Sequence, residues 1–282
     1  MIRRKIEENF FRILMVLATI VVAGSFFLIV GTIVYKGVPF MNWDMITKTP
    51  GGGFYIGKEG GVVNAIIGSL YVAGGATILG LLISIPVAIY INMYLAGRNI
   101  IANGLRIAFD VLFGIPSIVY GAFGFLIMVY FGIRASLLGG ILAVTLLVIP
   151  ILVRTLDEVI RTVPKELGDA SLSLGATRWE MSKVIIRQIR PGVFTAILLS
   201  FGRAMGDVAS VLFTAGFSDN IPTSLHQPAA TLPVAIFFQL GSPVAEVQGR
   251  AYASALLLTI IVLIITVLSS VLAKRFSKNN IR

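Results

Sequence analysis

The sequence has no cysteine and a single histidine, and only 13% of its 282 residues are charged. Without cysteine the chain has no disulfide framework, no thiol nucleophile and no cysteine-based metal site. The lone His226 argues against a zinc hydrolase, whose metal needs several protein ligands. It falls in a polar loop, where a histidine is usually solvated, so we assign it no role. We therefore expect no catalytic residue, no bound metal and no cofactor in this chain.

The low charge content is accompanied by a high content of apolar residues. They make up 57% of the chain, and its mean hydropathy of +0.93 is far above that of soluble domains. A net charge of +10 is compatible with nucleic-acid binding, but the basic residues are scattered at the ends of apolar runs and do not line one soluble face. The composition predicts an all-α polytopic membrane protein in the lipid bilayer, without a nucleic-acid partner.

Six apolar segments reach the roughly 20 residues that a spanning helix needs. They are residues 13–35, 66–95, 107–131, 136–156, 192–216 and 251–273. The first follows a basic start that resembles a signal peptide, but its apolar run continues to Tyr35 without a small-residue cleavage site, which favours a retained anchor. We expect a single transmembrane domain over residues 1–282.

Lysine and arginine indicate the orientation of these spans. Most of the 23 basic residues fall in stretches that are cytoplasmic if the N-terminus is inside, and such an excess marks the cytoplasmic side. Both termini are then predicted to be cytoplasmic. The loop of about 157–191 is cytoplasmic as well, and the loops of about 36–65 and 217–250 are external.

The first external loop contains Gly52, Gly57 and Lys58 at the spacing of a phosphate-binding P-loop. The next residue is Glu59, where that motif needs serine or threonine to hold magnesium. No apolar strand precedes the loop, and the predicted topology puts it on the side without ATP. We interpret it as a glycine-rich turn.

The second span carries a small or weakly polar residue at every fourth position. Such stripes allow helices to pack closely, so we expect this face to pack within the bundle, with a solute path or a partner contact as the alternative. The stripe consists of Ala76, Gly80, Ser84, Ala88 and Asn92.

Three prolines and one carboxylate interrupt the spans. Pro86, Pro116 and Pro150 lie inside the second, third and fourth spans, where each removes a backbone hydrogen bond and is expected to kink or break the helix. Asp110 lies about one turn inside the third span, and we expect its carboxylate to reach the cytoplasmic interface.

The stretch Lys165–Pro191 is a long polar interruption between two apolar runs, and its pattern predicts a helix, a glycine turn and a second helix. Pro164 suits the start of the first helix, and Gly175 suits the left-handed position that ends it. Thr177 and Glu180 then have the spacing of a capping box. The apolar positions are Leu167, Ala170 and Leu174 in the first helix and Met181, Val184 and Ile185 in the second.

Asp169-Ala170-Ser171, followed after three residues by Gly175, resembles the EAA-x3-G loop of permease subunits of binding-protein-dependent ABC importers. The following Ala-Thr-Arg-Trp is also common there. Asp169 and Ser171 replace the glutamate and second alanine of the pattern, and the proline that often follows Ile-x-Leu is delayed to Pro191. The resemblance implies that Asp169, Ala170, Ser171 and Gly175 belong to a coupling helix that docks in a cleft of an ATPase subunit.

A second interpretation of this stretch is an amphipathic helix lying on the lipid surface, favoured by its basic residues. The embedded glycine turn, the capping box and the direct fusion to the fifth span are more than surface binding requires. The basic residues concerned are Arg178, Lys183, Arg187 and Arg190.

The fifth span contains Arg203 and Asp207 one helical turn apart, near the middle of the membrane. Charges at that depth are functional candidates. Two interpretations are open from the residues alone. The two charges neutralise each other for structural reasons, or Arg203 offers N–H donors to an oxyanion while Asp207 holds it in place until the anion competes.

The run GRAMGD around Arg203 matches the R-x3-acid run of phosphate-importer permeases. The runs GFYIGKEGGVVNAIIGSLY, GIPSIVYGAFG and LPVAIFFQL are also similar to the PstA-type permeases of that family, so the matches extend from about Gly53 to Leu240. The resemblance implies a type I, MetI-like permease fold, inorganic phosphate as the solute, and a substrate path at Arg203 and Asp207.

In that family one permease forms half of the translocation pore. The resemblance implies a second related permease of the PstC type, a dimer of PstB-type ATPase subunits and an external phosphate-binding protein, in the cell membrane of a prokaryote, which is the inner membrane in a Gram-negative cell. This chain would be a non-catalytic subunit, with ATP hydrolysis in a partner. The alternatives are an ABC importer of another solute, such as sulfate or molybdate, and a secondary transporter, which should show inverted repeats.

Overall fold

The computed structural model describes residues 2–51, 59–95 and 99–277. These residues form helices and no strand, with one isolated antiparallel bridge between Pro50 and Gly60. The P-loop-like Gly52, Gly57 and Lys58 lie outside the described residues. The elements are α1 Ile2–Gly37, η1 Val38–Phe40, α2 Trp43–Thr47, α3 Val63–Ile89, the π-helix η2 Tyr90–Tyr94, α4 Asn99–Gly114, α5 Ser117–Tyr130, α6 Leu137–Arg161, α7 Lys165–Ser173, α8 Arg178–Gln188, α9 Arg190–Met205, α10 Leu232–Leu240 and α11 Ala245–Ser277.

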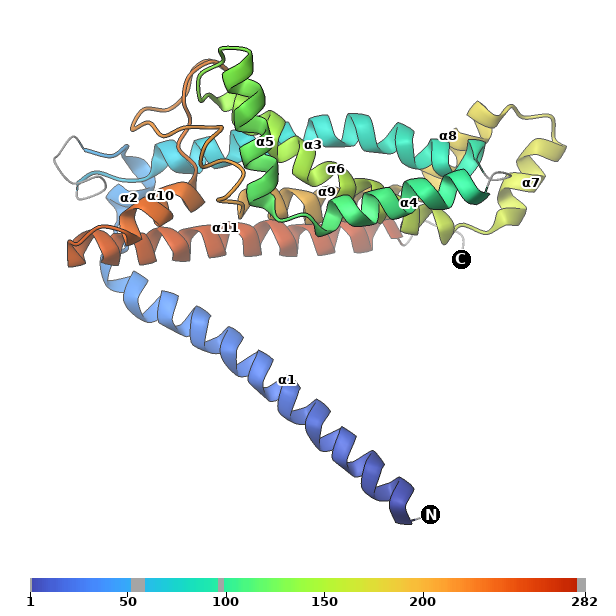
Figure 1. Ribbon diagram of the computed structural model, residues 1–282, viewed down its shortest axis with the longest axis horizontal. Helices are drawn as coiled ribbons and strands as arrows, with labels where there is room; N and C mark the ends of the chain where they lie inside the picture. Colours follow the sequence, from blue (N-terminus) through green and yellow to red (C-terminus); the bar gives the residue numbers. More distant parts are fainter. Residues whose placement is uncertain (1, 52–58, 96–98, 278–282) are drawn as a thin grey trace.

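Helices α3 and α6 pack against each other along the bundle, α9 packs against both, and α11 packs against α9 (Figure 1). The small-residue stripe of α3 makes this contact possible. At Gly80, an added Cβ would lie 2.9 Å from a Leu152 methyl and 3.0 Å from a Val148 methyl of α6. Ala76, Gly80, Ser84 and Ala88 are all buried. The interpretation of the stripe as a packing surface is therefore confirmed.

Four helical stretches are long and apolar enough to cross a membrane: α1, α3 with η2, α6 and α11. Two further pairs qualify only if each bent pair counts as one span, α4 with α5 at 93° and α8 with α9 at 70°. The described residues thus provide four to six spans. In Figure 1, α4 runs along the bundle and α5 across it.

The prolines act differently in the three helices. Pro116 is the N-cap of α5, with an extended ψ of 138°, and it separates α4 from α5. The third predicted span is thus broken at Pro116. Pro86 and Pro150 lie inside α3 and α6, which continue past them. Helix α3 changes to the π-helix η2 four residues after Pro86.

The predicted fifth span, 192–216, is wrong in its second half. Helix α9 ends at Met205, with Gly206 as its C-cap, and the backbone from there to residue 231 is irregular. This segment covers the start of α6, where the N–H of Ser136 donates to the carbonyl of Thr214 at 2.9 Å. An apolar run does not distinguish a helix from irregular backbone whose polar groups are satisfied inside the protein.

The segment 217–250, which is predicted to be an external loop, contains helix α10. The buried residues of α10 include Leu232, Val234 and Ala235, and its Gln239 is buried as well. The N–H of Leu232 donates to the hydroxyl of Ser69 on α3 at 2.8 Å. This part of the loop is therefore packed into the bundle.

Helix α1 stands apart from the bundle (Figure 1). The most apolar window of the stretch Glu7–Phe40 has no buried residue. Contact with the bundle is made near the C-terminal end of α1, where Gly37 packs against the backbone of Tyr252 on α11 and the Lys36 ammonium lies 4.9 Å from the centre of the Tyr252 ring.

Candidate functional site

The stretch predicted to couple the chain to an ATPase has the predicted local structure. Helix α7 is followed by Gly175 in the left-handed region, with φ +83°, and α8 begins after a complete capping box. The Thr177 N–H donates to the Glu180 carboxylate at 2.8 Å, and the Glu180 N–H donates to the Thr177 hydroxyl at 3.3 Å. The bond from the Thr177 N–H is the main reason that the pKa of Glu180 is lowered.

The apolar side chains of this element are only partly covered. No residue of α7 is fully buried. On the predicted apolar face Leu167 is half-buried, whereas Ala170 and Leu174 are exposed. In α8, Met181 and Ile185 are buried as expected, whereas Val184 is exposed. Within the α7–turn–α8 element, the most exposed large apolar side chains lie on either side of the Gly175 turn: Leu174 is 89% and Trp179 60% exposed.

Of the residues predicted to couple to an ATPase, Asp169, Ala170 and Ser171 lie on α7 and Gly175 forms the turn after it. Asp169 and Ala170 are exposed, and Ser171 is half-buried, with its hydroxyl donating to the carbonyl of Leu167 at 2.8 Å. The structure thus brings these residues onto one short element at the end of the bundle (Figure 1).

The coupling element is tied to the bundle through the π-helix η2. Arg178, the first residue of α8, donates a hydrogen bond to the carbonyl of Met93 in η2. Since a π-turn leaves carbonyls outside the regular ladder, such a carbonyl is available to a side chain from another helix. This hydrogen bond joins the start of α8 to the end of the α3–η2 helix.

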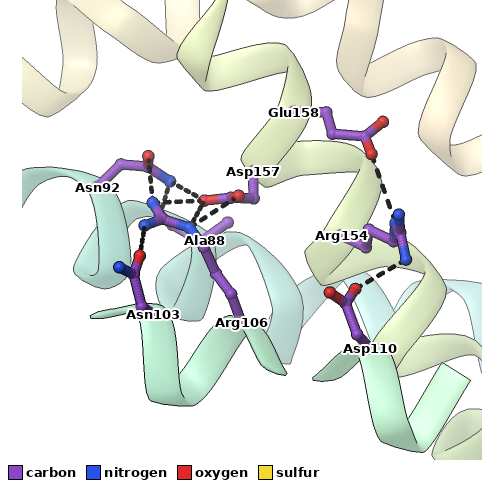
Figure 2. Close-up of polar contacts among 8 residues, drawn as sticks. All are labelled: Ala88, Asn92, Asn103, Arg106, Asp110, Arg154, Asp157 and Glu158. Carbon is purple, nitrogen blue, oxygen red and sulfur yellow. Dashed lines mark hydrogen bonds and ion pairs between the residues drawn. The ribbon is translucent and has the colours of Figure 1, made fainter. Parts of the chain in front are cut away.

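A buried charge network lies next to this contact (Figure 2). The Arg106 guanidinium on α4 makes two N–H bonds to the Asp157 carboxylate on α6, at 3.0 and 3.1 Å. Asn92 of η2 donates to the same carboxylate at 2.7 Å and accepts from Arg106 at 3.2 Å. Asn103 accepts a further bond from Arg106 at 3.3 Å. Three elements of the bundle are joined at this point.

A second, exposed pair lies on the same helices. Arg154 of α6 donates to Asp110 of α4 at 2.7 Å and to Glu158 at 3.4 Å (Figure 2). The Asp110 side chain is 52% exposed, which agrees with the expectation of a carboxylate at an interface. The basic partner of Asp110 was not predicted.

Sequence reasoning also missed the Arg106–Asp157 pair, because Arg106 was interpreted only as an orientation signal. One signal was present: Asn92 ends the small-residue stripe of α3, and its side chain makes hydrogen bonds where the other members only pack. A polar residue at the end of a packing stripe predicts a polar partner on the opposite helix.

Arg203 lies on the exposed face of α9 in this chain. Its side chain is 50% exposed, and Leu199, one turn earlier, is 57% exposed. It follows Arg190, the first residue of α9, by 13 positions, which places it about 20 Å along the helix. Among the described residues its guanidinium has one polar contact, with Asp207 at 3.9 Å.

Asp207 lies beyond the end of α9, so the two charges are not one turn apart on a continuous helix as predicted. The Asp207 side chain is 2% exposed. Its carboxylate accepts the Ser210 N–H at 2.9 Å and also the Ser210 hydroxyl. The Asp207 carboxylate therefore serves as the acceptor for Ser210 in the turn after α9. Most of the N–H donors of Arg203 have no acceptor among the described residues.

The described residues contain no group of three or more histidine, aspartate or glutamate side chains able to hold a metal ion. The polar features of the described residues are thus the α7–turn–α8 element at one end of the bundle, the Arg106–Asp157 network beside it, and Arg203 on α9 with unused donors. This arrangement suits binding and movement.

The comparisons with known proteins agree with these features. The family model of binding-protein-dependent transport system inner membrane components matches residues 80–281. The chain is 34% identical over 280 residues to the phosphate transport system permease protein PstA of Pasteurella multocida, with 98% of this chain and 97% of that protein covered. It is 34% identical over 252 residues to PstA of Haemophilus influenzae, with 88% and 87% covered.

The fold is also found among solved structures. An inward-facing form of the MetNI methionine ABC transporter matches with a TM-score of 0.60 over 76% of this chain and 95% of that chain, at 18% identity. At this identity the likeness supports the fold alone. With the family match and the relatives, it identifies the chain as a multi-pass membrane protein of the binding-protein-dependent transport system inner membrane component family, among the PstA-type permeases.

Proposed function

We propose that this chain is the permease subunit of an ATP-driven importer of inorganic phosphate and forms one half of its translocation pore. The observation that carries the proposal is the half-exposed Arg203 on α9. A guanidinium about 20 Å along a spanning helix is costly in lipid, so this face of α9 must border a polar space or a partner chain. A phosphate oxyanion supplies the acceptors that the Arg203 donors lack.

The energy of ATP hydrolysis is transmitted to the chain at the end of the bundle that holds α7 and α8. In this proposal α7 and α8 dock on an ATPase subunit through the exposed Leu174 and Trp179 around Gly175. ATP binding and hydrolysis then move the ATPase subunits, and α8 passes the motion to η2 through Arg178 and Met93. The bundle alternates between outward and inward access to the solute. The chain itself hydrolyses nothing.

The proposal includes partners and a location. A second permease of the PstC type completes the pore, two PstB-type ATPase subunits bind the coupling elements, and an external binding protein delivers phosphate. Both termini are cytoplasmic in a prokaryotic cell membrane, which is the inner one in a Gram-negative cell. The relatives, named as phosphate transport permeases, support this assignment.

The decisive experiment is reconstitution into proteoliposomes. We expect phosphate uptake only when the second permease, the ATPase subunits, ATP and the binding protein are all present. Uptake by this chain alone, driven by an ion gradient, would show a secondary transporter. ATP-dependent uptake of sulfate or molybdate in place of phosphate would retain the ABC mechanism and reject the solute.

Coupling is tested separately at Gly175. The residue has a positive φ of +83° and no atom within 4 Å of an added Cβ, so a substitution there acts through backbone strain and not through a clash. Gly175→Val should weaken ATPase pull-down because a β-branched residue disfavours this conformation. Gly175→Asn is the control, since asparagine tolerates it better. Normal association of the valine variant would contradict the proposed role of the turn.

A further inference from the structure

A cavity of about 800 Å³ lies between the coupling element and the bundle. One side is lined by residues of η2 and α4, and the other by the end of α6, the start of α7 and the inner face of α8. Gly168 and Met181 are among its lining residues, whereas the exposed Leu174 and Trp179 are not. The cavity is thus on the side of the coupling element that faces the bundle, away from its proposed docking tip.

The lining of this cavity is basic. It includes four cations, Arg106, Arg161, Lys165 and Arg178, and one carboxylate, Asp169. Arg106 is neutralised by Asp157, as described above. Three cations therefore share the cavity with a single acid.

None of these three cations has an anionic partner within the described residues. Arg161 and Lys165 form no ion pair within the described residues, and both side chains are exposed. Arg178 donates one hydrogen bond to Met93, which leaves further N–H donors on its guanidinium. The cavity therefore has several donors with fixed backbone positions and little internal acceptor capacity.

The start of α7 adds to this character. Its N-cap is Pro164, which provides no side-chain acceptor for the first N–H groups of the helix. Pro164 and Lys165 both line the cavity. The first turn of α7 also carries Glu166, which does not line the cavity. A helix start without a side-chain cap, beside a lysine and an arginine, favours an anion.

We propose that this cavity binds a phosphoryl anion through Arg161, Lys165 and Arg178. Guanidinium and ammonium groups together bind the oxygens of a phosphate group well. Two sources have this chemistry: free inorganic phosphate and the headgroup of an anionic phospholipid, which basic pockets between membrane helices also bind. A bound phosphoryl group bridges the end of α6 and the start of both coupling helices, and so restrains their relative movement. The site is separate from Arg203 and does not depend on which solute crosses the membrane.

The test uses the full chain carrying Arg203→Gln, so that the proposed substrate path does not contribute. Arg161→Gln with Lys165→Gln removes two cavity cations. Lys183→Gln with Arg187→Gln removes the same charge from α8 outside the cavity and is the matched control. Thermal melting without ligand checks that both variants remain folded.

One arm titrates inorganic phosphate into the protein in phosphatidylcholine nanodiscs, followed by calorimetry. The other counts phosphatidylglycerol molecules retained on the protein by native mass spectrometry. The expected result is binding in at least one arm that the cavity variant weakens at least about tenfold and the control variant leaves within about twofold. The responding arm identifies the source. Absence of binding in both arms, or equal loss in the two variants, would overturn the site.

Discussion

Two arginines of this chain show how differently one side chain is used. Arg106, at the joint of α4, α6 and η2, has its donors engaged by Asp157, Asn92 and Asn103 and is 26% exposed. Arg203, on α9, is 50% exposed and has one contact at 3.9 Å within the described residues. A guanidinium whose donors are mostly engaged holds helices together. We propose that one with unused donors binds the solute.

The strongest test of the difference between Arg106 and Arg203 is to remove the unused N–H donors of Arg203. Arg203→Gln should lower phosphate uptake by the complete transporter by up to about 100-fold, since hydrogen bonds to a charged group contribute up to about 3 kcal/mol. Assembly with the ATPase should be unchanged in a pull-down. Arg203→Lys, which keeps the charge and loses the fork, should give an intermediate rate. Unchanged uptake by the glutamine variant would exclude Arg203 as an anion ligand.

At Arg106 we expect a substitution to reduce the stability of the protein. Asp157→Asn leaves Arg106 without its carboxylate, and breaking a largely buried pair costs about 3 kcal/mol of stability. Denaturation in detergent measures the loss, with Arg106→Gln and the double variant completing a mutant cycle. A coupling energy near zero would mean that Arg106 and Asp157 do not act as a pair, and the contrast with Arg203 would disappear.

The exposed Arg154–Asp110 pair tests whether burial determines how much an ion pair contributes to stability. Asp110→Asn removes the partner of Arg154 on the same two helices, with side chains 52% and 45% exposed. Exposed ion pairs contribute little, so the expected loss is about 0.5 kcal/mol. The measurement is the same denaturation experiment. A loss as large as that of Asp157→Asn would show that burial is not what separates the two pairs.

The smallest effect is expected at Glu180, whose lowered pKa results from the capping box. A carboxyl with a lowered folded pKa contributes stability above its unfolded value, about 4.3, and this is lost as pH falls through the folded pKa. The melting temperature of Glu180→Gln should therefore be slightly below that of the unchanged protein at neutral pH and equal to it in acid. A difference that persists at low pH would contradict this origin.

The sequence predicted the local features well and the long-range ones poorly. The glycine turn, the capping box and the packing stripe depend on neighbours within a few residues, and all three are present. The end of α9 at Met205 was missed because the apolar run continues to Phe217, and hydropathy does not record which backbone groups are paired inside the protein. The pairing of Arg106 with Asp157 joins residues 51 positions apart, so no local pattern contains it.

The isolation of α1 has a consequence for how the protein is made. A helix with no buried residue over its apolar window satisfies its own backbone hydrogen bonds and needs no neighbour to be stable in lipid. It can enter the membrane while the rest of the chain is still being synthesised. Helices α3 and α6, whose contact depends on glycine and on a buried charge network, must both be inserted before they associate. We therefore expect α1 to insert early and the bundle to assemble later.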